Sequence, residues 1–531
     1  MTAPRRALSR WVILAGSSAV GVPALAIVLL IWAGGSDAAV DGLPEAGPIV
    51  HWGLPAVRAL RDLSATLSVG LLVVAATLLP AGSGPVTGAL GVVQRRTLHL
   101  GAASALAWSA AGMLVVVLTF AELAGSVPAG WRGLQAVGAF MAQEDLGRSL
   151  AATALLSTVA ALLARTATRV VTAGWAAVLA LSALLPLALT GHAAGSGDHA
   201  IAVDAQAAHL VGVSVWVGSL AALLLLGRAL QASLPVVAAR FSRLAAWCYG
   251  IVAASGVAGA WVRVGDSSTL AGTYALLLLV KVGALLLLGA AGWAHRHRLL
   301  PRLSEPGARR AFLRLIAVEL AVMAAAIGVA VALSGTPSQD VSTAPRVLGR
   351  AESLLGYPMP PALDGMAWLT QWRLDSLWLP VAVLALWWYL RLVRRLGRRG
   401  DRWPASRTIS WAVGCLMLIA ATNGSPGVYG SVLFSMHMVQ HMTIAMAVPV
   451  FLVLGAPVTL ALRATARRRD GSYGAREWLL LIVHSRFLGV LGHPIVASVL
   501  FIASLTAFYY SPLFELALRT HTGHVLTRIR E

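Results

Sequence analysis

Apolar stretches of close to 20 residues recur along this chain, and they restrict its fold more than any other feature. About 20 predominantly apolar residues are needed for a helix to cross a bilayer, where every backbone polar group must be satisfied within the segment. Hydrophobic residues make up 58% of the 531 residues and charged residues only 12%, whereas a soluble domain carries about 25% charged residues. The sequence therefore predicts an all-α fold, a polytopic integral membrane helical bundle.

The apolar runs predict about 13 membrane spans. They lie near residues 11–33, 63–82, 99–120, 147–164, 170–190, 206–227, 244–263, 271–293, 312–334, 374–395, 407–422, 431–458 and 488–510. The first run exceeds the roughly 7–15 apolar residues of a signal-peptide core, so it is interpreted as a retained span.

Arginine is concentrated in alternate loops between these spans, as in "RLVRRLGRRGDR" at 391–402. By the positive-inside rule this pattern predicts a multi-pass protein of the cell (plasma) membrane with a cytoplasmic N-terminus. The net charge of +20 is therefore assigned to topology and to contact with anionic headgroups of the lipid bilayer. Nucleic acid is not expected as a partner.

A proline-containing stretch without an apolar period separates two groups of spans. It predicts a membrane domain at 1–335, an extracytoplasmic linker at 336–373 and a second membrane domain at 374–531. The two cysteines, Cys248 and Cys415, both fall inside predicted spans and form no C-x-x-C motif. They are interpreted as small buried hydrophobic residues.

Lys281 and Glu319 lie well inside predicted spans, and a charge at the bilayer centre costs at least about 2.5–3.5 kcal/mol. Lys281 is the only lysine, and Glu319 lies in the following span. Because consecutive spans are antiparallel neighbours, we expect a structural ion pair between these two side chains. His295 and His297 stand in "HRHR" at the end of the Lys281 span and are interpreted as part of a solvated basic loop.

Histidines also gather before and within the sixth predicted span. His192 and His199 lie in the loop "GHAAGSGDHA", and His209 starts the apolar run that follows. Imidazole groups at the mouth of a helix bundle can bind a first-row metal cation. A loop of this kind can equally be a solvated surface, so both interpretations of the loop remain open.

The segment "SMHMVQHM" at 435–442 opens another apolar run. On a helix, residues four apart are neighbours about 5–6 Å apart at Cβ, so His437 and His441 share one face. Met438 and Met442 form a second ridge on the same helix. Imidazole and thioether together favour soft Cu(I), although imidazole alone also binds Zn.

Four pieces of the first half resemble the CopD copper-resistance membrane domain. They are "HLVGVSVWVGSL" at 209–220, "RFSRLA" at 240–245, "SGVAGAW" at 255–261 and "TYALLLLVK" at 273–281. The resemblance implies copper import or tolerance, with outer-side histidines as candidate ligands. His209 falls on one of these motifs.

Four pieces of the second half resemble the CtaG-type cytochrome c oxidase assembly factor. They are "QWRLDSLWLP" at 371–380, "YGSVLFSMHMVQHM" at 429–442, "LGAPVTLALRA" at 454–464 and "GHPIVASVLF" at 492–501. The resemblance implies that His437 and His441 are the leading copper ligands, with His521 and His524 as additions. Fused CopD–CtaG proteins are typical of actinobacteria. Because the family continues with further spans, the second domain is expected to be C-terminally incomplete.

The combined expectation is a protein that takes up or relays copper at the outer face and supports cytochrome c oxidase assembly. Expected partners are copper ions or a periplasmic copper carrier, and cytochrome c oxidase subunits. The sequence has no GxxxxGK[ST] phosphate-binding loop, and no enzyme activity is expected. Two alternatives remain: a haem-binding transmembrane electron-transfer protein and a metal-free oxidase assembly scaffold.

Overall fold

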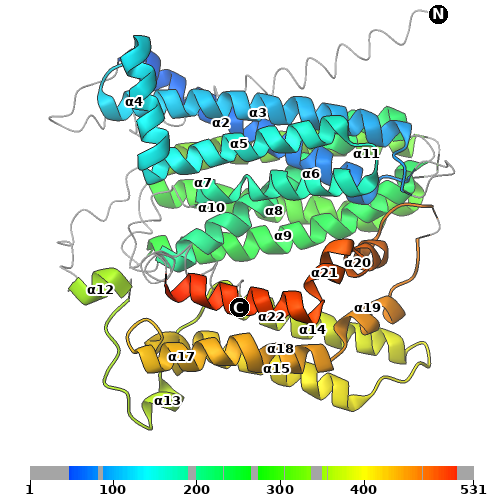
Figure 1. The fold of residues 1–531 in the computed structure, drawn as a ribbon. Coiled ribbons are helices and arrows are strands. Elements are labelled where there is room, and N and C mark those ends of the chain that lie inside the picture. Colours follow the sequence, from blue (N-terminus) through cyan, green and yellow to red (C-terminus); the bar gives the residue numbers. More distant parts are fainter. Residues whose placement is uncertain are drawn as a thin grey trace, which may run out of the picture. The chain divides into compact units, whose positions relative to one another are not determined.

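The computed structural model describes residues 47–81, 88–188, 199–230, 233–264, 273–303, 305, 307–335, 350–355, 357–468 and 470–510. These residues form helices, with one isolated β-bridge and no β-strand among them (Figure 1). Nine of the described segments are long and apolar enough to cross a membrane: Pro48–Leu78, Val92–Ala124, Asp145–Thr166, Val170–Ala188, Ile201–Leu230, Leu234–Val262, Leu278–Arg302, Ala405–Tyr429 and Phe434–Ala464. The chain is therefore an all-α, multi-pass membrane protein, as the sequence predicts.

The predicted number of spans is not reached within the described residues. The predicted span 11–33 lies outside them, and the span predicted at 488–510 contains the shorter helix α22 (Pro494–Tyr509). The spans predicted at 312–334 and 374–395 correspond to helices α11 (Ala308–Gly335) and α14 (Trp378–Gly397), and neither helix is among the nine segments. Three arginines in its last two turns make α14 too charged to qualify by composition.

The chain divides into two compact units. The first holds Met1–Ser196, Ala205–Ala344 and Asp470–Ser472, and the second holds Gly197–Asp204, Pro345–Arg469 and Tyr473–Glu531. The boundary between the first unit and the second, at residues 344 and 345, falls inside the predicted linker. The roles predicted for the two domains stay predictions.

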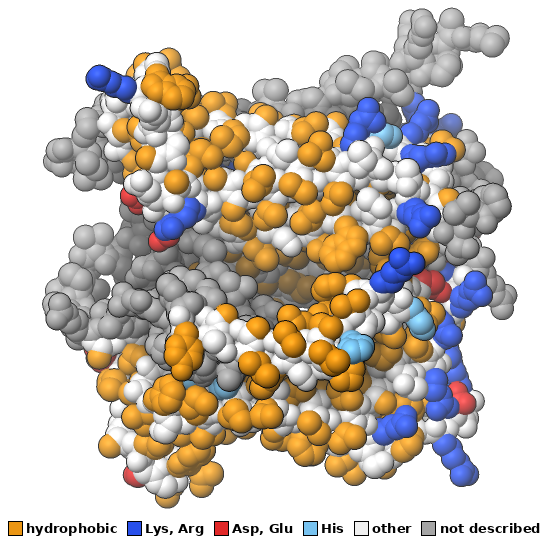
Figure 2. Space-filling model, in the orientation of Figure 1, with side chains coloured by type: hydrophobic (Ala, Val, Ile, Leu, Met, Phe, Trp, Pro, Cys, Tyr) orange, Lys and Arg blue, Asp and Glu red, His pale blue; other side chains and the backbone are white. Residues whose placement is uncertain are grey.

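Long helices packed side by side form the first unit (Figure 1). Its elements are α2 (Pro48–Val73), η1 (Val74–Leu78), α3 (Val92–Ala124), α4 (Gly130–Gln143), α5 (Asp145–Thr166), α6 (Val170–Ser182), α7 (Leu185–Ala188), α8 (His199–Leu230, whose start belongs to the second unit), α9 (Leu234–Val264), α10 (Thr273–Ala294), η5 (His295–Leu299), η6 (Leu300–Arg302) and α11 (Ala308–Gly335). Apolar side chains cover the lengths of these helices, and basic side chains gather at one end of them (Figure 2).

A direct backbone contact joins α2 to α8 in the first unit. A Cβ atom added to Gly70 would lie 1.8 Å from the carbonyl carbon of Gly218, and one added to Gly218 would lie 1.9 Å from the Thr66 carbonyl oxygen. Ser68 and Ser219 beside this contact are fully buried. Small residues allow such close packing of membrane helices, which dispersion forces then stabilise.

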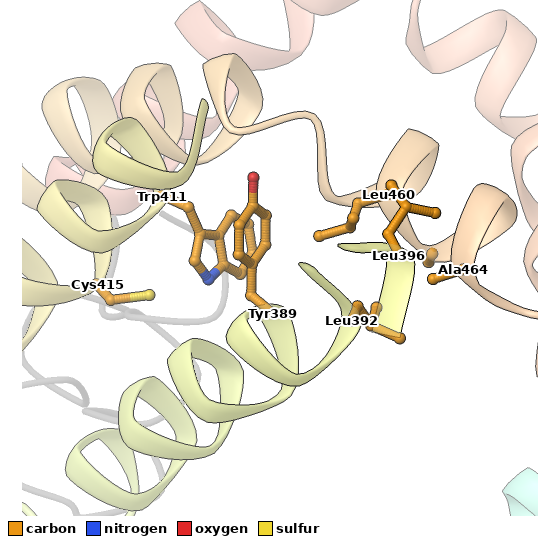
Figure 3. Packing of buried hydrophobic residues seen from close by; sticks show 8 residues of the cluster. Tyr389, Leu392, Leu396, Trp411, Cys415, Leu460 and Ala464 are labelled. Atoms are coloured by element: carbon orange, nitrogen blue, oxygen red, sulfur yellow. The ribbon is translucent and has the colours of Figure 1, made fainter. Parts of the chain in front are cut away.

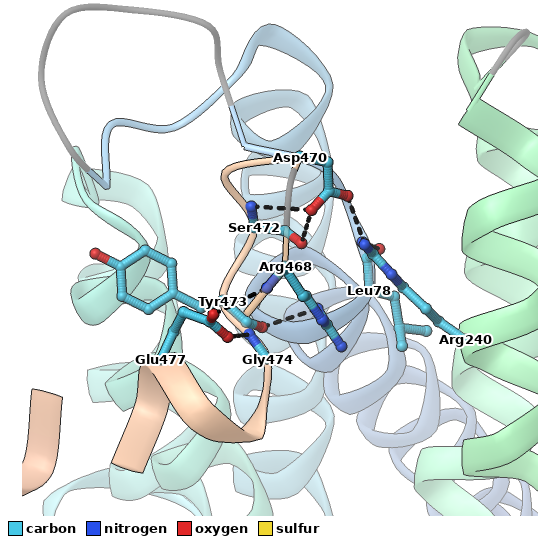
Figure 4. A network of polar contacts seen from close by, with 8 residues as sticks. All are labelled: Leu78, Arg240, Arg468, Asp470, Ser472, Tyr473, Gly474 and Glu477. Carbon is cyan, nitrogen blue, oxygen red and sulfur yellow. Dashed lines mark hydrogen bonds and ion pairs between the residues drawn. The ribbon is translucent and has the colours of Figure 1, made fainter. Parts of the chain in front are cut away.

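A buried arginine joins helix ends in the same unit (Figure 4). Arg240 on α9 donates to the carbonyl oxygen of Leu78, at the end of η1, and pairs with the Asp470 carboxylate. The carbonyl of Leu78 belongs to the last helical turn, where backbone acceptors lack helical partners. Ser472 donates its hydroxyl proton to the same carboxylate. The Arg240 guanidinium therefore satisfies a carbonyl group at a helix end, and the Asp470 carboxylate pairs with its charge.

The pKa of Asp470 is held below its ordinary value. Burial alone would raise this pKa, but hydrogen bonds from Ser472 and Arg240 and the positive charge of Arg240 outweigh burial. A carboxylate of this kind favours the folded state when it is ionised.

The second unit consists of shorter helices. Its elements are α12 (Arg350–Leu355), α13 (Ala367–Thr370), α14 (Trp378–Gly397), α15 (Ala405–Asn423), α16 (Ser425–Tyr429), α17 (Phe434–Met442), η7 (Thr443–Ala447), α18 (Val448–Leu454), α19 (Pro457–Ala464), α20 (Ala475–Val483), α21 (Arg486–Leu491) and α22 (Pro494–Tyr509). Glu477 begins α20 by accepting hydrogen bonds from the backbone N–H groups of Arg468 and Gly474 (Figure 4).

An aromatic pair forms the core of the second unit (Figure 3). The Tyr389 and Trp411 rings stack with centroids 5.0 Å apart, and the Tyr389 hydroxyl donates to the Gly455 carbonyl oxygen over 2.7 Å. Gly455 and Ala456 make the turn between α18 and α19, and Ala456 adopts a left-handed φ of 48°. The "LGAP" motif therefore ends α18 a few residues before the C-terminal bound of the predicted span 431–458, and the aromatic pair fixes this turn.

We expect Gly218→Ala to destabilise the first unit, because the new methyl group collides with backbone that no side-chain rotation can move. Overpacking of this kind costs typically about 1–3 kcal/mol. The matched control is Gly250→Ala on α9, where an added Cβ meets no atom within 4 Å. The apparent Tm of each variant in detergent checks this, and equal Tm values for both would contradict it.

We expect Asp470→Asn to lower stability at neutral pH. Because the folded pKa is depressed, the carboxylate contributes fully above its unfolded pKa of about 3.9, and the contribution is lost as the pH falls through the lower folded pKa. The difference in Tm between wild type and variant should therefore shrink on acidification below about pH 4. A difference that is independent of pH would contradict the assignment.

Candidate functional site

The two histidines of the "SMHMVQHM" segment lie on helix α17. The backbone N–H of His437 bonds to the Leu433 carbonyl oxygen over 2.9 Å, so His437 already stands in regular helix one turn before His441. The two imidazole rings are parallel within 2°, and their centroids are 6.4 Å apart. One metal ion bound to both rings needs nitrogens at most about 4 Å apart, and this ring separation is compatible with that.

The faces of α17 differ in exposure. His441 is 8% exposed and Met436 is 2% exposed, whereas Met442 is 47% exposed. The imidazole of His441 is thus packed inside the unit, while the Met442 thioether is accessible from outside it. The helix presents its soft sulfur ligand on the accessible side and its nitrogen ligand on the packed side.

A π-helical turn, η7, follows directly after Met442 and leads into α18. Its backbone hydrogen bonds span five residues instead of four, which widens the helix locally. Such turns in membrane and soluble helices are frequently found at functional sites. Here the wider turn lies next to the histidine pair.

Gln440 lies on the side of α17 opposite to the exposed Met442 and anchors the helix there. Its amide Nε2 donates to the Ala421 carbonyl oxygen of α15 over 3.0 Å, and its Oε1 lies against Gly430 so closely that a Cβ there would be 2.7 Å away. Gln440 is 8% exposed. This buried hydrogen bond determines the rotation of α17 about its axis, and so the direction of His437 and His441.

Asn423 holds the "QWRLD" segment at the end of α15. Its Oδ1 accepts from the Asp375 backbone N–H over 2.6 Å, and its backbone carbonyl accepts from Arg373 N–H over 2.8 Å. Asp375 in turn accepts from the backbone N–H groups of Leu377 and Trp378, which begins α14. The sequence patterns predicted no role for this motif or for Gln440. The amide side chains of Asn423 and Gln440, each within an apolar run, are the feature from which their hydrogen-bonding roles could have been expected.

His209 lies on α8 and meets α9. Its Nδ1 is 3.1 Å from Ser255 Oγ, and Ser255 donates its own proton to the Val252 carbonyl oxygen. With the serine proton committed, Nδ1 must be the donor of the His209–Ser255 bond. Neutral His209 then carries an unprotonated Nε2, which is the form that binds a metal.

The remaining predicted residues are placed as follows. His192, His521 and His524 lie outside the described residues, and only the backbone of His199 is described, as the start of α8. The side chain at ion-pair distance from Glu319 is His295, whose Nδ1 is 3.2 Å from Glu319 Oε1. The predicted Lys281–Glu319 pair is not confirmed. Lys281 precedes His295 by about 21 Å of helix.

His295 also corrects the interpretation of "HRHR" as a solvated loop. The residue is 7% exposed and belongs to η5, a π-helical turn that continues α10. Its ring packs at a centroid distance of 5.5 Å from Phe312 on α11. Helix packing buries this histidine, although its neighbours Arg296 and His297 remain exposed.

Within the described residues, no three His, Cys, Asp or Glu side chains converge on a point where one metal ion could bind. Cys248 and Cys415 are buried free thiols, as predicted. Within the described residues, the histidine pair on α17 therefore offers two imidazole side chains, and Met438 and Met442 on the same helix offer thioethers beside them. Two or three ligands of this type suit Cu(I) better than the four that a structural zinc site requires.

We expect Asn423→Ala to destabilise the second unit, because the Asp375 N–H then loses its buried acceptor. An unsatisfied buried group costs about 1–3 kcal/mol. The control is Thr443→Ala, which removes only a hydrogen bond to Val439 within one helix. Tm and the rate of proteolysis at the 371–375 segment should both change in the first variant only; unchanged values in Asn423→Ala would contradict its role.

Three family models match successive parts of the chain. The model described as copper resistance protein D-like, N-terminal domain, matches residues 49–202, and the model described as copper resistance protein D matches 235–333. The model described as cytochrome c oxidase caa3 assembly factor matches 387–529 and includes α17.

Three curated relatives cover one part of the chain. Uncharacterized proteins of Mycobacterium bovis and Mycobacterium tuberculosis are each 46% identical over 191 residues, which is 35% of this chain and 29% of each relative. One of Mycobacterium leprae is 40% identical over 192 residues, with the same two shares. The chain thus matches less than a third of the length of these relatives.

No solved structure matches the chain. The family matches follow one another without overlap and in the order that the sequence motifs predict. This one chain therefore fuses copper resistance protein D regions, including the N-terminal one, with a caa3-type cytochrome c oxidase assembly factor region.

Proposed function

We propose that this protein takes up or relays copper at the outer face of the plasma membrane and supports copper delivery to cytochrome c oxidase. The N-terminus is cytoplasmic in this proposal, and copper is the cargo. The basic ends of the first unit's helices support that orientation by the positive-inside rule.

The parallel rings of His437 and His441 are the observation that carries the proposal. They lie on the helix that falls within the match to the oxidase assembly factor. Two imidazoles and the neighbouring Met438 and Met442 thioethers form a donor set that suits Cu(I). The proposed route begins at exposed Met442 and continues to buried His441, so the ion moves by ligand exchange and no bond in the protein breaks.

A site for transfer must bind its ion without trapping it. Two nitrogens and labile thioethers meet this requirement better than a closed four-ligand cage. The buried Gln440 bond holds α17 in one rotation, so both imidazoles keep their direction while the ion exchanges. His209, with its available Nε2, is proposed as a second ligand position in the copper resistance protein D region.

The haem alternative requires two histidines that approach one iron from opposite sides. His437 and His441 lie on one face of one helix, so they cannot supply both axial ligands. Copper handling is therefore the proposal that the α17 geometry favours over haem binding. An assembly scaffold that binds no metal would not require His437 and His441 on one helix face.

We expect the double variant His437→Ala/His441→Ala to lose about one bound Cu(I) ion per chain, because these two imidazoles are the nitrogen ligands that the described residues bring together on α17. The measurement is copper per chain by mass spectrometry after anaerobic Cu(I) loading and removal of loosely bound ion. The matched control is His484→Ala/His493→Ala, which removes two histidines from the same unit but outside α17.

Oxidase activity in cells that carry each variant gives the second measurement. The α17 variant should lower activity and the control should not. Unchanged copper content and unchanged oxidase activity would favour the scaffold, and a Soret absorbance band in the purified protein would favour haem binding. Circular dichroism of both variants confirms that the helices are retained.

A further inference from the structure

A cavity of about 240 Å³ lies in the first unit among α8, α9, η5 and the helices α10 and α11. Its walls are mainly aromatic and aliphatic, and the aromatic residues are Trp216, Phe241, Tyr249, Trp293 and Phe312. The proposed copper route uses none of these residues. Gly292 on α10 also lines the cavity, and an added Cβ there would meet no atom within 4 Å.

Two buried polar atoms in the cavity wall lack hydrogen-bond partners. They are Nε2 of His295, which is 7% exposed, and Oε1 of Glu319, which is 6% exposed. Glu319 Oε1 lies 3.2 Å from His295 Nδ1, but this approach is not aligned as a hydrogen bond. A polar group that is buried without a hydrogen-bond partner destabilises the protein. A ligand that hydrogen-bonds both atoms would remove this destabilisation.

The fixed charges in the wall decide which ligand fits. The Arg296 guanidinium is held at the wall by hydrogen bonds to Ser242 Oγ (3.1 Å) and to the Ser242 carbonyl oxygen (2.6 Å). It disfavours a cation, and the Glu319 carboxylate disfavours an anion. His297 also lines the cavity. A neutral ligand that both donates and accepts hydrogen bonds meets neither repulsion.

The size and opening of the cavity restrict the ligand further. Pockets for drug-sized molecules have roughly 300–1,000 Å³, so about 240 Å³ holds a single substituted ring and is too small for haem. Trp293 is 59% exposed, so the cavity opens at the side of α10. An apolar molecule can enter from that side without passing through water.

We infer that this cavity binds a lipid-soluble quinol, with its ring among the aromatic side chains and its hydroxyl groups hydrogen-bonded to His295 and Glu319. Offset or edge-on contact with the aromatic side chains favours such a ring. A lipid acyl chain could fill the same space but would leave both polar atoms unpaired. The inference does not depend on the proposed copper function.

The test uses the full chain in lipid nanodiscs under anaerobic conditions and durohydroquinone, a single-ring quinol whose ring carbons are fully substituted and whose hydroxyl groups can donate to the Glu319 carboxylate. Equilibrium dialysis should show saturable binding of about one molecule per chain. Gly292→Leu fills the cavity and should weaken binding by at least about tenfold. His295→Leu and Glu319→Leu should each weaken binding as well, because each removes one hydrogen-bonding group.

The matched control for Gly292→Leu is Gly283→Leu, at an exposed glycine on the same helix with equally open space around it. This control and His437→Ala/His441→Ala should both bind durohydroquinone like the wild type. Absence of saturable binding to the wild type, or wild-type binding by Gly292→Leu, would overturn the inference. Loss of a copper ion in His295→Leu with unchanged quinol binding would identify a cation site instead and would also overturn it.

Discussion

The cost of an unpaired polar group in an apolar interior governs where this chain can place its chemistry. Water is absent from the centre of a bilayer, so each buried polar side chain needs a partner from the protein itself. Gln440 meets this requirement with the Ala421 carbonyl, and His209 meets it with Ser255. Both bonds join neighbouring helices. They therefore fix helix rotation, and through rotation they fix the direction in which the candidate metal ligands point.

The two units use this constraint in different ways. On α17 the polar anchor, Gln440, bonds to the Ala421 carbonyl of α15 and not to the proposed copper ligands, so binding of an ion leaves the anchor intact. In the cavity beside α10, His295 and Glu319 lie against one another without a complete set of hydrogen bonds. The first arrangement suits an ion that exchanges between ligands. The second suits a neutral molecule that supplies the missing bonds.

The features that were predicted correctly depend on patterns between residues close together in the sequence. The helical class, most of the long spans and the common face of His437 and His441 depend on apolar length and on a four-residue interval. The prediction for His295 was wrong, because a basic tetrapeptide indicates a solvated loop and only the packing of α11 against η5 buries the ring. The left-handed φ of Ala456 could not be predicted either, because contacts of the distant residues Tyr389 and Trp411 around Gly455 fix this turn.

Three features can be recognised without the structure: the chain is a helical membrane protein, some of its motifs resemble copper and oxidase assembly proteins, and two of its histidines share a helix face. The packed helices are needed to show that Gly70 meets Gly218, that His209 pairs with Ser255 and that Glu319 lies beside His295. Apolar length and helical repeat act between residues a few positions apart, so they can be recognised in the sequence. The partner of a buried polar group depends on which helices pack together and at what rotation, and no local pattern specifies that.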